Sequence, residues 1–164
     1  MTDDTTADTA PAPSPAEKPA ALVFWRLLAL VYDALPVVAL WMVIGTLFVV
    51  ALYATQHNAR AYVHPWSLLN WIEWALCWLV GGLYAVLSWH RGGQTLGMRP
   101  WRLFVTNVDG SRPGWRALWT RYAVGTLSLL AGGLGFWWAW FDRDRKTWHD
   151  RASGTVMRRR PKGS

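Results

Sequence analysis

Charged residues and cysteines are scarce in this sequence of 164 residues. Only 16% of the residues are charged, whereas a typical soluble domain has roughly 25%. The single cysteine, Cys77, excludes a disulfide framework within the chain and any metal site built from several cysteines. The sequence also lacks a phosphate-binding loop, a dinucleotide fingerprint and His, Cys, Asp or Glu residues at metal-ligand spacing. We therefore expect no enzyme activity, no cofactor and no bound metal.

Apolar and aromatic residues are abundant instead. Hydrophobic residues make up 52% of the chain, and 14 residues are tryptophan. The net charge of +7 does not indicate a nucleic-acid partner, because the basic residues flank apolar blocks and do not cover a folded face. The composition predicts a membrane protein whose main partner is the lipid bilayer.

Three apolar blocks are predicted to be membrane elements, at about residues 24–54, 67–89 and 122–141. The first two are each long enough to cross a hydrocarbon core of about 30 Å as helices. The third has a glycine cluster at Gly132, Gly133 and Gly135 near its middle. We expect this third block either to span the membrane or to enter it and return on the same side.

Segments outside and between these blocks complete the predicted organisation. Residues 1–21 are rich in Ala, Pro, Thr and acid and are predicted to be a disordered tail. Residues 22–157 form the membrane domain, and residues 158–164 form a basic C-terminal tail. Residues 101–108 read as a short strand that runs into a turn. The expected fold is an all-α membrane protein with two transmembrane helices, a third glycine-interrupted element and a short cytoplasmic β-hairpin-like segment.

The distribution of basic residues predicts the orientation of the chain. The 55–66 connection has one arginine, whereas residues 90–121 have six. By the positive-inside rule, the N-terminus and residues 90–121 face the cytoplasm of a multi-pass protein in the cell membrane. A complete third span would place residues 142–164, with eight Lys and Arg, outside. This conflict with the rule is the reason for considering the re-entrant alternative.

Three ionisable side chains lie in the first two apolar blocks: Arg26, Asp33 and Glu73. An ionisable group inside a membrane costs several kcal/mol, so each is a candidate functional residue. Arg26 and Asp33 share a helix face but lie about 10 Å apart along the axis at 1.5 Å per residue. Each is therefore expected to meet a partner from another segment; the candidates are Arg121, Arg143, Arg145, His149, Asp150 and Arg151. Glu73 either lines an outward-facing polar pocket or reaches back to the interface.

Several sequence features occur together in a recognisable pattern. Arg26 and Asp33 lie in WRLLALVYDAL, the second block runs into GQTLGMRPW, Arg121 precedes the third block, and the chain continues with WHDRASGT. Over about residues 24–157, this arrangement resembles the RDD family of small integral membrane proteins, which is named for one arginine and two aspartates.

The resemblance implies residue roles. It places the family's arginine at Arg26, its first aspartate at Asp33 and its second at Asp150, with Asp142 as the alternative for the second. One departure is Met98, which stands where many members carry lysine. Any role that depends on that lysine is therefore in doubt here.

For function, the resemblance implies transport, including exchange of monovalent cations for protons. We hypothesise that Asp33 binds a proton or small cation, while Arg26 and Asp150 set its charge state. Two or three helices enclose little volume, so a homo-oligomer is expected. The alternative is a non-transporting module that binds another membrane protein and uses Asp33 and Arg26 as structural charge pairs. A polar cavity beside Asp33 favours transport, whereas a dry ion pair favours the alternative.

Overall fold

The computed structural model describes residues 22–56 and 67–160. Within these ranges it contains seven elements, in the order α1 (Val23–Gln56), α2 (Leu68–Gly92), β1 (Leu103–Asn107), α3 (Trp115–Leu130), α4 (Leu134–Phe141), α5 (Trp148–Ser153) and β2 (Thr155–Arg159). The predictions for residues 1–21, for most of the 55–66 connection and for the last four residues lie outside the described ranges.

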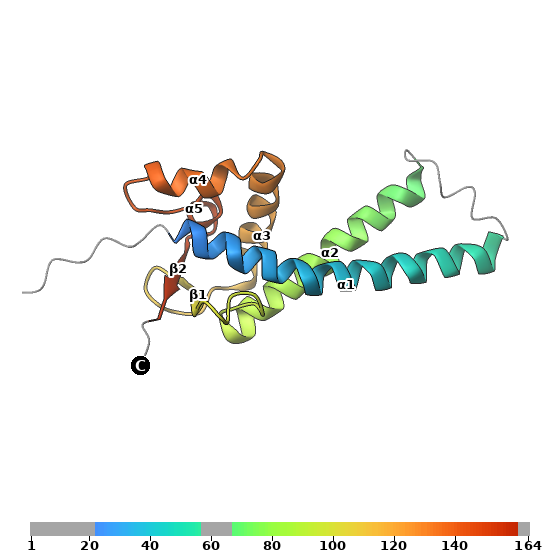
Figure 1. Ribbon diagram of the computed structural model, residues 1–164, viewed down its shortest axis with the longest axis horizontal. Helices are drawn as coiled ribbons and strands as arrows, with labels where there is room; N and C mark the ends of the chain where they lie inside the picture. The colour runs from blue at the N-terminus through green and yellow to red at the C-terminus, as the bar shows by residue number, and fades with distance from the viewer. Residues whose placement is uncertain (1–21, 57–66, 161–164) are drawn as a thin grey trace, which may run out of the picture.

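Helices α1 and α2 are long and apolar enough to cross a membrane. Their most apolar 18-residue windows have mean hydropathies of 2.5 and 1.4. They form a hairpin whose far half, the teal end of α1 and the green start of α2, extends beyond the rest of the structure (Figure 1). The indole Nε1 of Trp41 donates to the carbonyl oxygen of Cys77 at 2.9 Å and so joins the two helices. The predicted pair of membrane-spanning helices is therefore confirmed by length and composition.

The third apolar block is broken at the predicted glycines. Helix α3 ends at Leu130, α4 begins at Leu134, and their axes differ by 98°. Gly132 and Gly133 have φ values of 70° and 78°, a region that glycine adopts without the steric cost of a side chain. Helix α3 also starts earlier than the predicted block, at Trp115, so the basic segment before residue 122 and the apolar segment after it form one helix.

The small sheet corrects the prediction of a β-hairpin-like segment. Strand β1 does not pair with a neighbouring strand across the turn at Asp109. It pairs antiparallel with β2, with Leu103 opposite Arg159 and Asn107 opposite Thr155. The prediction was wrong because it rested on a local turn signal, whereas a partner about fifty residues away leaves no local pattern in the sequence.

The hydrophobic core lies at one end of the molecule. The first turns of α1, the last turns of α2, helices α3 to α5 and the sheet all gather there (Figure 1). The buried apolar side chains of this core are Ala29, Val86, Met98, Leu103, Val105 and Leu118. Gly82 of α2 allows the close approach of α3, because a Cβ at this position would lie 2.6 Å from the ring of Trp119. This packed end holds most of the ionisable residues that the sequence singles out.

Candidate functional site

A buried carboxylate, Asp150, lies between two arginines from distant parts of the chain. Its Oδ2 is 2.5 Å from Nη1 of Arg26, and its Oδ1 is 2.5 Å from Nη1 of Arg121. All three residues are at most 5% exposed. The ion pairs join α1, α3 and α5, so Arg26, Arg121 and Asp150 are called the charge clamp below.

The local sequence of α5 fixes the position of Asp150. Thr147 is the N-cap of this helix, and its side chain accepts a hydrogen bond from the backbone N–H of Asp150 at 3.3 Å. Asp150 in turn accepts from the backbone N–H of Thr147, which completes a capping box. Two hydroxyls extend the clamp, because Arg26 also donates to Thr147 at 3.1 Å and Arg121 donates to Thr155 at 2.8 Å.

Burial and charge act in opposite directions on Asp150. Burial alone would raise the pKa of its carboxyl, but the positive charges of Arg121 and Arg26 outweigh burial and hold that pKa well below its ordinary value. Two arginines and one carboxylate leave the clamp with one excess positive charge. The neighbouring His149 responds to the same surroundings. Burial, together with the charge of Arg121, lowers the pKa of His149 well below its ordinary value, which favours the neutral imidazole.

Asp33 lies apart from the clamp and has no ion pair with Arg26. Its Oδ1 accepts hydrogen bonds from the Tyr84 hydroxyl and from the backbone N–H of Gly97, both at 2.8 Å. Its Oδ2 accepts a hydrogen bond from the Thr95 hydroxyl. These three donors come from α2 and from the segment that follows it, so Asp33 fastens that segment to α1.

Gly97 allows this segment to lie directly on the backbone of α1. A Cβ at Gly97 would overlap the carbonyl oxygen of Ala29 and lie 2.7 Å from the backbone nitrogen of Asp33. The motif GQTLGMRPW therefore has a structural explanation. It supplies one hydroxyl, one backbone donor and one position without a side chain to the surroundings of Asp33.

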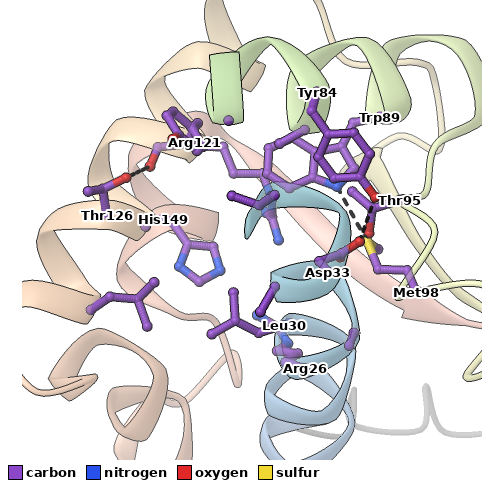
Figure 2. A pocket seen from close by; sticks show the side chains of 18 of the residues that line it. Arg26, Leu30, Asp33, Tyr84, Trp89, Thr95, Met98, Arg121, Thr126 and His149 are labelled. Carbon is purple, nitrogen blue, oxygen red and sulfur yellow. Dashed lines mark hydrogen bonds between the residues drawn. The ribbon is translucent and has the colours of Figure 1, made fainter. Parts of the chain in front are cut away.

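A cavity of about 370 Å³ separates Asp33 from the clamp. Figure 2 shows Asp33 with Tyr84 and Thr95 on one side of α1, whereas His149 and Arg121 lie toward the other. The walls come from α1, α2 and α3 and are mainly apolar; they include Leu30, Val37, Trp41, Trp78, Ala85, Gly125 and Leu129. The cavity thus brings the Asp33 carboxylate, four hydroxyl groups and the two arginines of the clamp around one apolar space.

The remaining predicted residues lie elsewhere. Glu73 lies in the far half of the hairpin and faces α1, since a Cβ at Gly45 would be 3.2 Å from its Oε1. Asp142, the alternative second aspartate, pairs with Arg151 at 2.6 Å and is not part of the clamp. Within residues 22–56 and 67–160, no three His, Cys, Asp or Glu side chains gather as a metal site.

Sequence reasoning missed the residues that surround the predicted charges. Tyr84, Thr95 and Gly97 bind Asp33, yet none carries a charge that marks it within an apolar sequence. The spacing of Thr147 and Asp150 is a capping-box signal, so the start of α5 was detectable. The pairing of Arg26 with Asp150 agrees with the expectation that each membrane charge meets a partner from another segment.

Comparison with known proteins gives one match. Residues 20–154 match the family model described as RDD family. No curated protein and no solved structure matches the chain. The matched range covers Arg26, Asp33 and Asp150, and it includes the whole cavity wall apart from Met157.

We predict that Asp150→Asn destabilises the fold by about 3–5 kcal/mol, because it leaves two buried arginines without a compensating charge. Denaturant unfolding of the purified protein in detergent micelles measures the change. The matched control is Asp144→Asn, since Asp144 is 61% exposed and pairs with Lys146 at 3.6 Å. This exposed pair is expected to contribute less than about 1 kcal/mol. Equal effects of the two substitutions would contradict a stabilising clamp.

We also predict that the folded state loses stability as the pH falls from 7 to 5. His149 takes up a proton near pH 6.5 when unfolded, but its folded pKa is well below that value. The unfolded state then binds more protons, so the free energy of unfolding decreases with decreasing pH. Melting temperatures across this range should show a smaller decrease in His149→Gln than in the wild type. Identical pH dependence in the two proteins would contradict the assignment to His149.

Proposed function

The chain belongs to the RDD family and is a membrane protein, and we propose that its Asp33 binds a proton or a monovalent cation during exchange across the membrane. The observation that carries the proposal is the position of Asp33 at the cavity, beside two hydroxyl groups and without an arginine partner. Both arginines at the cavity are bound to Asp150 instead. The Asp33 carboxylate is therefore free of a fixed counter-charge.

The groups around Asp33 suit a small cation or a proton. The two carboxylate oxygens and the hydroxyls of Tyr84 and Thr95 provide four oxygen atoms at one point of the cavity. Oxygen ligands of this kind bind hard cations, and a carboxyl group within a membrane is a common proton carrier in transporters. A hydroxyl can turn its hydrogen away from Asp33 when a cation arrives, because hydroxyl groups both donate and accept.

The clamp has a different role in this proposal from the one that the sequence suggested. Arg26 and Asp150 bind each other, so they hold α1 against α3 and α5 and do not set the charge of Asp33 by contact. Glu73, in the far half of the hairpin, supplies a second carboxylate along the path toward the opposite membrane face. The cavity beside Asp33 has a modest volume of about 370 Å³, and a homo-oligomer completes the path.

The small sheet supports a specific topology. Strands of one sheet lie on the same side of a membrane, and β1 precedes the broken α3–α4 element while β2 follows it. We therefore propose that α3 and α4 form a re-entrant element. The start of α1 lies on the same side, because Arg26 pairs with Asp150. The arginine-rich sequence on this side supports an orientation in which it and the N-terminus face the cytoplasm of a multi-pass protein of the cell membrane.

A second candidate function is a non-transporting module that binds another membrane protein or a second copy of this chain. The buried, hydrogen-bonded clamp favours it, because these charges act there as structural pairs. The three hydrogen bonds to Asp33 then serve only to hold the segment after α2.

The transport proposal predicts that proteoliposomes with the wild-type protein move protons when Na⁺ or K⁺ is added on one side, as followed by a trapped pH-sensitive dye. Asp33→Asn should reduce this movement to the level of protein-free liposomes, since an amide neither ionises nor carries a proton. Asp144→Asn, at an exposed position, is the control that keeps the activity. An inert wild type, or an active Asp33→Asn protein that folds normally, would reject the proposal and favour the second candidate.

The topology predicts a labelling pattern in intact cells. On a Cys77→Ser background, cysteines placed at Asp109 and Ser164 should both resist a membrane-impermeant maleimide until the cells are permeabilised. A cysteine at Thr55, the far end of α1, should react from outside. Labelling of Asp109→Cys and Ser164→Cys from opposite sides would contradict the re-entrant element.

A further inference from the structure

The cavity between α1, α2 and α3 has a cationic end and an apolar end. The cationic side chains Arg26 and Arg121, together with His149, lie at the end where α1 begins. Farther along α1 and α2, the walls are apolar and aromatic, with Trp41 and Trp78. Arg26 and Trp41 are about 20 Å apart along the helix at 1.5 Å per residue. This length is half of the roughly 40 Å thickness of a bilayer with its headgroups.

Two polar atoms at the cationic end have no hydrogen-bond partner among the described residues. They are Nε of Arg26 and Nδ1 of His149, and both belong to side chains that are at most 5% exposed. Leaving a buried polar atom unpaired costs about 1–3 kcal/mol, so such atoms are rare in folded proteins. An acceptor within the cavity would satisfy the arginine N–H.

The excess positive charge at the Arg26 end of the cavity also favours binding of an anion. The clamp has one more arginine than carboxylate, and it is buried in an apolar environment. Asp33 lines the same cavity, but it lies two helical turns along α1 from Arg26, and its oxygens accept hydrogen bonds from Tyr84, Thr95 and Gly97. Asp33 therefore does not neutralise the excess charge by contact.

The rim of the cavity is open toward the region that lipid occupies. Leu30 is 37% exposed, and Trp41 and Leu129 are each 42% exposed; all three line the cavity. An acyl chain can therefore enter sideways from the hydrocarbon and need not pass through water.

From this geometry we infer that the cavity binds an anionic amphiphile: an acyl chain with a carboxylate or phosphate head. The head lies beside Arg26, Arg121 and His149, and the chain runs between α1, α2 and α3 toward Trp41 and Trp78. Such a ligand comes either from free fatty acids or from anionic phospholipids of the adjacent leaflet. This binding goes beyond ion exchange at Asp33 and does not depend on it.

Gly125 of α3 provides a variant that fills the cavity without disturbing its walls. It lines the cavity, and a Cβ at this position would meet no atom within 4 Å. Gly125→Leu therefore occupies space that the acyl chain needs, while it improves the helix propensity of α3. Gly92→Leu is the matched control, because Gly92 lies at the end of α2, away from the cavity, and also has open space around it.

The test uses the purified protein in nanodiscs of neutral lipid and three photoreactive diazirine probes with the same acyl chain. The probes are a fatty acid, a phosphatidic acid and, as the uncharged comparison, a fatty alcohol. Cross-linked peptides are located by mass spectrometry. We expect at least one anionic probe to label cavity residues of the wild type and of Gly92→Leu at least tenfold more than the alcohol does. Gly125→Leu should lose this labelling.

Comparison of the fatty acid with the phosphatidic acid identifies the source of the ligand. A third variant, His149→Phe, keeps a ring against Phe136, which lies 4.8 Å from the imidazole between ring centroids, and should weaken labelling by the anionic probes severalfold. Asp33→Asn removes a negative charge from the cavity wall, so labelling by the anionic probes should not decrease, and failure of ion exchange leaves this test unaffected. Equal labelling by alcohol and anions, or undiminished labelling of a folded Gly125→Leu protein, would overturn the inference.

Discussion

The packed end of the molecule depends on one buried carboxylate shared by two arginines. Asp150 draws together the start of α1, the middle of α3 and the short helix α5. Removing Asp150 would leave two buried arginines unpaired in an environment that solvates ions poorly. The hydroxyls of Thr147 and Thr155 complete the arrangement. The apolar core, the sheet and the cavity surround this group of residues, and its ion pairs fix their relative positions.

The sequence was sufficient for features that depend on local composition. The two long apolar helices and the glycine break near Gly132 follow from residue type and spacing, and Asp150 was one of the candidate partners for Arg26. The pairing of β1 with β2 did not follow, because it joins segments about fifty residues apart and the only turn signal lay beside β1. The same limit applies to Asp33, whose partners are an uncharged tyrosine, a threonine and a backbone N–H.

The separation of Asp33 from the clamp changes the interpretation of the charged residues in the membrane helices. A direct contact between Arg26 and Asp33 would have produced a neutral pair and a closed site. Instead, Arg26 forms an ion pair with Asp150. Asp33 lines the cavity and accepts hydrogen bonds from uncharged donors. One carboxylate thereby joins three helices by ion pairs, and the other lines the cavity without an ion pair to Arg26 or Arg121. The clamp keeps one excess positive charge beside the cavity, because one carboxylate pairs with two arginines.

The long sequence separation within the clamp has a consequence for biosynthesis. Arg26 and its partner are 124 residues apart, so α1 and α2 leave the ribosome and enter the bilayer well before Asp150 is made. During that interval the arginine lacks its partner Asp150, and water or lipid phosphates must solvate it. Closure of α5 and β2 onto α1 is then a late step of synthesis, and translation products truncated before α5 would retain an inserted hairpin without the assembled end.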